Sequence, residues 1–238
     1  ALSCNVDFLF GNWDLIYFEG RHAMERIPER VPVRHAKVEI GSIRGTSSHQ
    51  YNPAMILCDP AATEDFGNCY GFCFAYSGNF VAGAQKDQRG LTRVQMGINP
   101  VQFRYTLAAG EAFFAPQVLM SYSSEGFTGL THDLIREHIC RGAYKHAKRP
   151  VLINNWEATY FDFDKEKIVK IAQQAHELGI EMLVLDDGWF GKRDSDNSGL
   201  GDWYTNEKKM DGTMGELGDE IHALGMKFGL WFEPEMIN

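Results

Sequence analysis

The sequence predicts an antiparallel β-sandwich over residues 1–148, followed by the first part of a (β/α)8 barrel over residues 149–238. Three observations support this α/β plus all-β prediction. Short alternating stretches, separated by Gly, Pro, Asn and Asp, fill the first segment and are typical of antiparallel sheets. The second segment alternates short apolar runs with helix-sized inserts, as parallel βα units do. Each of those runs ends in acidic and aromatic residues, at the face where barrels carry their sites.

Composition narrows the class of protein. The formal net charge of −9 argues against nucleic-acid and anionic-membrane partners, because both select basic patches. No apolar run approaches the ~20 residues that cross a bilayer, and the N-terminus lacks the basic and apolar regions of a signal peptide. We therefore expect a cytoplasmic protein. The 5 cysteines are scattered and odd in number, which predicts free thiols rather than a zinc site or disulfides.

The first segment is predicted to be mostly strands. Alternating stretches bounded by turn residues lie at residues 33–41, 70–78, 91–100, 101–110 and 113–124. A connecting helix is predicted over residues 129–147, where apolar residues recur at roughly helical spacing. These residues are Leu130, Leu134, Ile135, Ile139 and Tyr144.

The second segment begins with a strand-like run at residues 151–156. A helix follows, with Asp164 as its N-cap and Gly179 just beyond its C-terminus. Its inward face consists of residues at i, i+3, i+4, i+7 and i+10. They are Ile168, Ile171, Ala172, Ala175 and Leu178.

The next apolar run, residues 182–187, is predicted to be a parallel strand covered on both faces. A polar loop over residues 191–211 leads to a helix over residues 214–225, with Leu217, Ile221 and Leu224 inward. Residues 227–234 form the third strand. Three such units fit a doubly wound sheet or a barrel, and a barrel of ~250 residues would have about three of its eight units here.

Acidic and aromatic residues stand at all three strand ends. They are Trp156, Glu157, Asp186, Asp187, Trp231, Glu233 and Glu235. Acids at such junctions also cap helices, an explanation that is weakest for Asp186 and Trp231. Carboxylates accept hydrogen bonds from sugar hydroxyls and indoles stack on sugar rings, so the pattern favours a carbohydrate site. From the residues alone, Asp186 or Asp187 paired with Glu233 would suit glycoside hydrolysis.

Two further candidates, Asp202 and Trp203, follow a Gly-rich turn in the polar loop. They indicate either a substrate lid over the strand ends or a surface loop anchored by its indole.

Four long segments resemble one enzyme family. RGTSSHQYNP, NNWEATYFDF, LDDGWFGKRDSDNSGLGDW and GLWFEPEM are similar to the bacterial α-galactosidases of glycoside hydrolase family 36. The resemblance implies the later part of an N-terminal β-supersandwich followed by the first three strands of a catalytic (β/α)8 barrel.

The resemblance also implies residue roles. Asp186 and Asp187 would bind the 4- and 6-hydroxyls of galactose, and Trp156 and Trp231 would wall the pocket. The family's nucleophile lies in a K-x-D-x-N motif on the fourth strand and its acid/base later still. We therefore expect no catalytic acid in this chain, and Glu233 becomes a supporting acid.

By resemblance, the expected reaction is the hydrolysis of terminal α-galactose from melibiose- and raffinose-type oligosaccharides. It would proceed by retaining double displacement, between carboxyls ~5 Å apart. No cofactor or metal is implied, and the full-length protein is expected to be a homo-oligomer, in many relatives a tetramer. Alternatives are an α-N-acetylgalactosaminidase, a raffinose-synthase-like galactosyltransferase and, from another class, a non-catalytic carbohydrate-binding module. The isolated chain is expected to be inactive.

Overall fold

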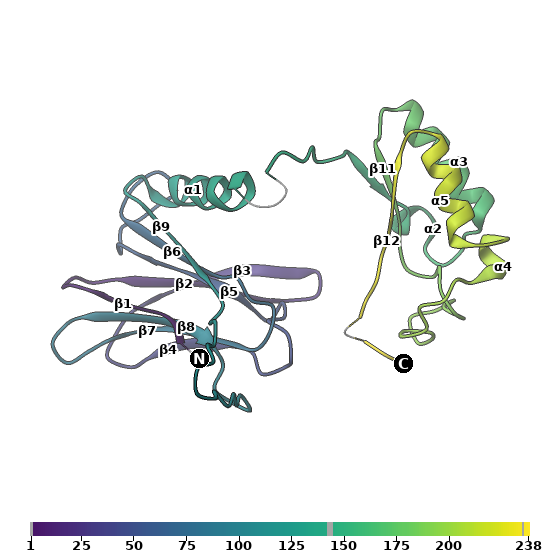
Figure 1. Ribbon diagram of the computed structural model, residues 1–238. Coiled ribbons are helices and arrows are strands. Elements are labelled where there is room, and N and C mark those ends of the chain that lie inside the picture. The colour runs from purple at the N-terminus through teal and green to yellow at the C-terminus, as the bar shows by residue number, and fades with distance from the viewer. Residues whose placement is uncertain (1, 142–144, 235) are drawn as a thin grey trace. The chain divides into compact units, whose positions relative to one another are not determined.

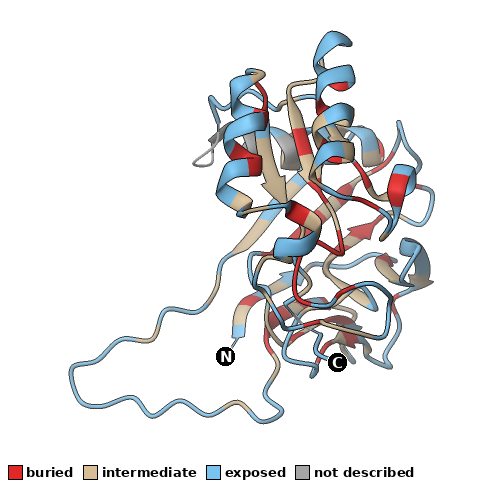
Figure 2. Cartoon of the chain, turned by 90° about the vertical axis from the view of Figure 1, so that its right-hand side faces the viewer, coloured by how far each residue is buried: buried red, intermediate tan, exposed pale blue. Residues whose placement is uncertain are grey.

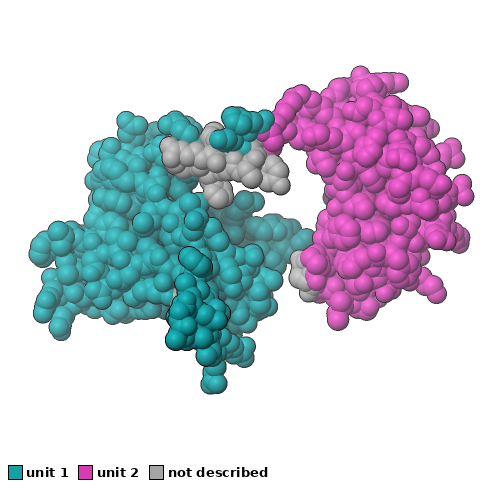
Figure 3. Space-filling model, viewed as in Figure 1, with its two compact units in different colours: residues 1–146 teal, residues 147–238 magenta. Residues whose placement is uncertain are grey.

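The structure is a computed structural model that describes residues 2–141, 145–234 and 236–238 (Figure 1). It divides into two compact units, Ala1–His146 and Ala147–Asn238, which Figure 3 colours separately. The sequence-based prediction has the boundary after residue 148, and the two units meet between His146 and Ala147. Of helix residues 135 and 137–141 only the backbone is described.

Unit 1 contains two antiparallel sheets. The first is four-stranded, in the order β1-β8-β7-β4. Its strands are β1 (Leu2–Phe8), β4 (Val38–Gly41), β7 (Phe80–Lys86) and β8 (Thr92–Ile98). The second is five-stranded, in the order β3-β2-β5-β6-β9. Its strands are β2 (Asp14–Arg21), β3 (Met24–Pro32), β5 (Tyr51–Cys58), β6 (Cys69–Phe74) and β9 (Val118–Ser123).

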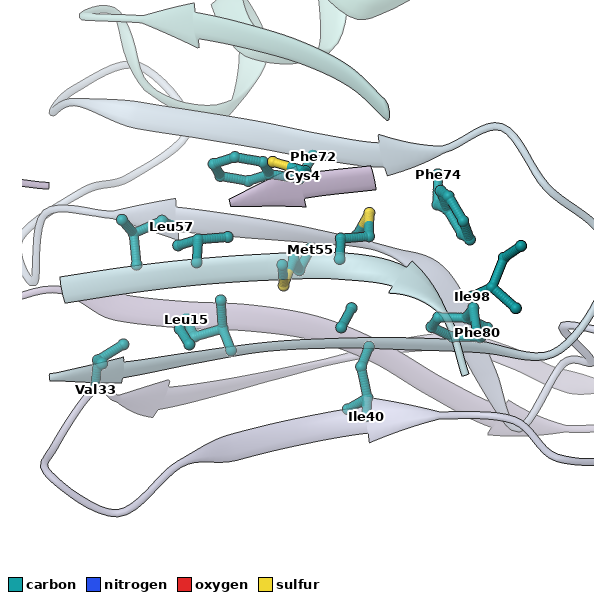
Figure 4. Packing of buried hydrophobic residues seen from close by; sticks show 14 residues of the cluster. Cys4, Leu15, Val33, Ile40, Met55, Leu57, Phe72, Phe74, Phe80 and Ile98 are labelled. Atoms are coloured by element: carbon teal, nitrogen blue, oxygen red, sulfur yellow. The ribbon is translucent and has the colours of Figure 1, made fainter. Parts of the chain in front are cut away.

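The core of unit 1 lies between these sheets (Figure 4). Leu15, Met55 and Phe72 enter it from the second sheet, and Ile40 and Phe80 enter it from the first. All five side chains are buried, which confirms the predicted antiparallel sandwich.

Helix α1 (Gly126–Arg141) covers the outer side of the second sheet. It begins three residues before the predicted start. Leu130 and Leu134 pack over Gly71 of β6, where the missing side chain makes room for them. Of the other residues used to predict this helix, Tyr144 and the side chains of Ile135 and Ile139 lie outside the described residues.

One predicted strand is wrong. Residues 101–110 alternate but form no strand, and residues 101–117 are mostly exposed (Figure 2). Gln102 adopts a positive φ of 59°, which turns the chain as it leaves β8. A strand exists only when its backbone pairs with a neighbour, and periodicity alone does not supply one.

Cys4, Cys58, Cys69 and Cys73 are free thiols, as predicted, and the side chain of Cys140 lies outside the described residues. Burial raises the pKa of Cys58 to about 12, so this thiol is protonated and unreactive at neutral pH.

Unit 2 contains a three-stranded parallel sheet in the order β10-β11-β12. Its strands are β10 (Leu152–Asn154), β11 (Met182–Leu185) and β12 (Lys227–Leu230). Helices α3 (Lys165–Glu177) and α5 (Met214–Ala223) pack against one face of it. Two short helices are also present: α2 (Trp156–Thr159) begins at the last residue of the strand predicted over residues 151–156, and α4 (Glu207–Met210) lies in the predicted polar loop.

Both predicted caps of α3 are confirmed. The Asp164 side chain accepts the Lys167 amide at the start of α3, and Gly179 follows its end with a φ of 81°. Thr213 and Glu216 form a reciprocal capping box at the start of α5. Ile168, Ala172 and Ala175 of α3 and Leu217 and Ile221 of α5 are buried on the inward faces, as predicted. The prediction is wrong for Leu178, which is 82% exposed because α3 ends at Glu177 and the chain leaves the helical spacing there.

Strand β11 departs from the expectation of burial on both faces. Leu183 and Leu185 are fully buried against the helices, whereas Met182 and Val184 are half-buried. The reason is that the described helices cover one face of the sheet. No described helix is long and apolar enough to span a bilayer.

Candidate functional site

The carboxyl ends of β10 and β11 are tied together by two asparagines. Asn155 is fully buried; its Oδ1 accepts the Asp186 amide at 2.8 Å and its Nδ2 donates to Thr159 at 2.9 Å. The side chain of Asn154 donates to Asp186 Oδ2 and accepts the Trp156 amide. Sequence reasoning missed both asparagines, although an amide pair directly after an apolar run was an available signal.

The two adjacent acids occupy different environments. Burial alternates along β11 and beyond it, so that Asp186 continues the half-buried face of Val184 and Asp187 the buried face of Leu185. This is the two-residue period of an extended chain. Asp186 is therefore the more accessible acid, held by neutral amides, and Asp187 is enclosed.

Asp187 forms a buried ion pair with Arg193. Nε of Arg193 lies 2.9 Å from Oδ1 and Nη2 lies 2.7 Å from Oδ2. The hydrogen bond to Asp187 raises the pKa of Arg193, and the charges of Asp187, Asp196 and Glu233 act in the same direction. Sequence reasoning missed Arg193, because the charged run around it is typical of a solvated loop.

Arg193 also organises the loop that follows. Its Nη1 donates to the carbonyls of Ser195 and Ser198 at 2.8 and 2.9 Å, and its guanidinium lies 5.5 Å from the ring centroid of Phe161. The same side chain therefore contacts the strand-end acid, the loop and the segment after α2.

Lys209 of α4 is a second basic anchor. Its Nζ donates to the carbonyls of Phe161 and Gly188 at 3.1 and 3.2 Å and pairs with Asp194 at 2.9 Å. It also lies 4.9 Å from the ring centroid of Phe163. These bonds join the loops that follow β10 and β11.

The two predicted wall residues are both half-buried. Trp156 stands at the start of α2, with its ring edge-on to Tyr160 and Phe161. Trp231 follows β12; its amide donates to Leu185 and its carbonyl accepts the indole N–H of Trp189 at 2.9 Å. Trp231 is therefore placed beside the end of β11 by its main chain.

The further candidates lie nearby. Trp203 packs against Phe190 and Phe232, with ring centroids 4.4 and 5.2 Å away, so the indole anchors the polar loop. Asp202 is exposed and Glu233 is half-buried, its charge acting on Arg193. Glu235 lies outside the described residues.

The strand ends therefore bring Asp186, Asp187 and Trp231 to one edge of the sheet. Within the described ranges, no three His, Cys, Asp or Glu side chains converge as metal ligands. A groove between α3, α4 and α5, lined in part by Lys165, Lys170, Lys208 and Glu220, contains none of the predicted site residues.

A sandwich followed by parallel strands that end in acids and indoles is typical of barrel glycoside hydrolases. The sequence model of the glycosyl hydrolase family 36 N-terminal domain matches residues 1–108, and that of the melibiases matches residues 112–238. The chain belongs to the melibiases of glycoside hydrolase family 36.

Individual proteins that are similar to this chain are α-galactosidases. The bifunctional α-galactosidase/sucrose kinase AgaSK of Mediterraneibacter gnavus is 54% identical over 100% of this chain and 26% of its own length. The α-galactosidase AgaA of Geobacillus stearothermophilus is 49% identical over 100% of this chain and 33% of its own length.

Solved structures show the same fold. The crystal structure of AgaA superposes with a TM-score of 0.88 at 49% identity, covering 98% of this chain and 33% of that chain. An α-galactosidase from Lactobacillus brevis superposes with a TM-score of 0.89 at 45% identity, covering 100% and 32%. The chain thus spans a third or less of the length of these relatives, and its unit 2 is the start of the barrel domain.

Proposed function

We propose that this chain forms part of an α-galactosidase and that its strand ends bind the terminal galactose. Asp186 and Asp187 accept hydrogen bonds from galactose hydroxyls, and Trp156 and Trp231 wall the pocket. One observation carries this proposal. The accessible Asp186 and the ion-paired Asp187 stand at the end of β11, beside the indole of Trp231 at the end of β12.

Oligosaccharides ending in α-galactose are the proposed substrates. Variants of AgaA have been crystallised with raffinose and with stachyose, and another variant with 1-deoxygalactonojirimycin. The identity of 48–49% between those proteins and this chain supports the same substrate class here.

The test is kinetic. The complete encoded protein is expected to hydrolyse p-nitrophenyl α-D-galactoside and to release galactose from raffinose. Asp186→Asn should lower kcat/KM about tenfold or more, because a charged acceptor is replaced by a neutral one. Asp162→Asn is the matched control, because Asp162 is an acid of the same unit whose side chain is 97% exposed. Wild-type protein without turnover would contradict the proposal.

The 238-residue polypeptide alone is expected to give no turnover. It contains no K-x-D-x-N segment, and the proposal assigns both bond-breaking acids to residues outside it. Turnover by this polypeptide would move the chemistry to Asp186, Asp187 or Glu233. The same assay, run beside the complete protein at equal molar concentration, decides between these outcomes.

A further inference from the structure

We propose that Arg193 is the positioning residue of the galactose site. It orients the Asp187 carboxylate so that one oxygen remains available to a sugar hydroxyl, and it attaches the following loop to that carboxylate. This inference rests on the proposed function and deepens it.

The hydrogen bonds between the two side chains define which oxygen remains available. Oδ2 of Asp187 accepts Nη2 at 2.7 Å and Nε at 3.1 Å, whereas Oδ1 accepts Nε at 2.9 Å. A carboxylate oxygen has about two acceptor sites, so Oδ1 keeps one for a further donor. The planar guanidinium also sets the rotation of the carboxylate, which an ammonium would leave free.

Burial makes the loss of either partner of the Arg193–Asp187 ion pair energetically costly. The side chains of Arg193 and Asp187 are only 4% and 8% exposed. Removing either partner leaves an uncompensated charge inside the unit, which is strongly unfavourable. Asp186 has no such constraint, since it is half-buried and held by neutral groups.

Arg193 is itself held from several directions. Its Nη1 donates to two loop carbonyls, its guanidinium lies over Phe161, and its own carbonyl accepts Lys209 Nζ at 3.3 Å. A side chain anchored in this way fixes the acid before the sugar arrives. Such preorganisation lowers the conformational-entropy cost of binding, because the carboxylate is already ordered in the unliganded site.

Substitution of the guanidinium tests the idea in the complete encoded protein. Arg193→Lys keeps the charge and loses the fork, and KM for p-nitrophenyl α-D-galactoside should rise about tenfold while kcat changes little. The physical reason is that Asp187 binds a hydroxyl that does not react, so its displacement weakens substrate and transition state alike. The dissociation constant of 1-deoxygalactonojirimycin, measured by calorimetry, should rise in parallel.

Arg93→Lys is the matched control. Arg93 makes the same two-bond contact with Asp7, through Nε and Nη2 at 2.7 and 2.8 Å, on the exposed surface of unit 1. Its substitution should leave KM unchanged.

A double-mutant cycle separates positioning from a purely structural role. If Arg193 acts through Asp187, then adding Arg193→Lys to Asp187→Asn should raise KM little further. Wild-type turnover with independent, multiplicative effects of the two substitutions would overturn the inference alone. Absence of wild-type turnover and of inhibitor binding would overturn the proposed function and this inference with it.

Discussion

At the residue scale, a glycine directly after the two adjacent acids turns the chain at the end of β11. Asp187 belongs to the helix-covered side, and Gly188 follows it with a φ of 98°. An added Cβ at Gly188 would lie 3.0 Å from Phe161 Cδ1 and 3.3 Å from Phe163 Cε1. The position therefore requires glycine both for its dihedral angle and for lack of space.

These two requirements can be separated by experiment. Gly179 has a similar φ of 81° with nothing within 4 Å of an added Cβ. Gly179→Ala should lower the free energy of unfolding by about 1 kcal/mol, from backbone strain alone. Gly188→Ala should cost at least about 1 kcal/mol more because it also crowds two rings. Urea unfolding followed by tryptophan fluorescence measures the loss of unfolding free energy for both variants. Equal losses would show that the rings of Phe161 and Phe163 move aside without a measurable energetic cost.

At the scale of elements, the helices of unit 2 owe their positions to an apolar face and a defined start. Asp164 has an extended backbone, and its carboxylate accepts the Lys167 amide at 2.8 Å. The Thr213 and Glu216 pair performs the same task for α5. Both helices therefore have a defined first turn, and α3 and α5 cover the same face of the sheet.

The N-cap of α3 carries a quantitative prediction. Asp164→Ala should destabilise the chain by about 1 kcal/mol, because one backbone N–H of the first turn loses its acceptor. Asp164→Asn should restore most of that loss, since asparagine caps as well as aspartate does. If both variants lose the same stability in urea unfolding, the charge at the helix N-terminus, and not the hydrogen bond, is what matters.

At the scale of the whole molecule, the two units have separate hydrophobic cores. One core lies between the sheets of unit 1, and another lies between the parallel sheet and the helices of unit 2. Phe72 and Leu183 are fully buried representatives of the two. Each unit therefore has a buried core formed by its own residues.

Truncation of one core should leave the other intact. Phe72→Ala should destabilise unit 1 by about 3–5 kcal/mol and Leu183→Ala unit 2 by about 2–5 kcal/mol, through lost burial and a cavity. Hydrogen exchange read by mass spectrometry should show faster amide exchange only in the unit that carries the substitution. Faster exchange in both units after either change would mean that they unfold together.

The sequence by itself determined the features that depend on local spacing. The amphipathic faces of α3 and α5, the caps of α3, the apolar run of β11 and the family motifs all lie within short stretches, where the spacing of apolar residues shows which residues share a face. The acids at the strand ends were found for the same reason, because a polar residue directly after an apolar run is visible without coordinates.

Only the tertiary structure decided what distant residues do to one another. Residues 101–110 alternate like a strand but have no backbone partner, so they form none. Arg193 stands among charged loop residues, yet it is buried under Phe161 and bound to Asp187. Its role follows from the loss of water around two opposite charges, and burial is a property of the folded chain that no short stretch of sequence contains.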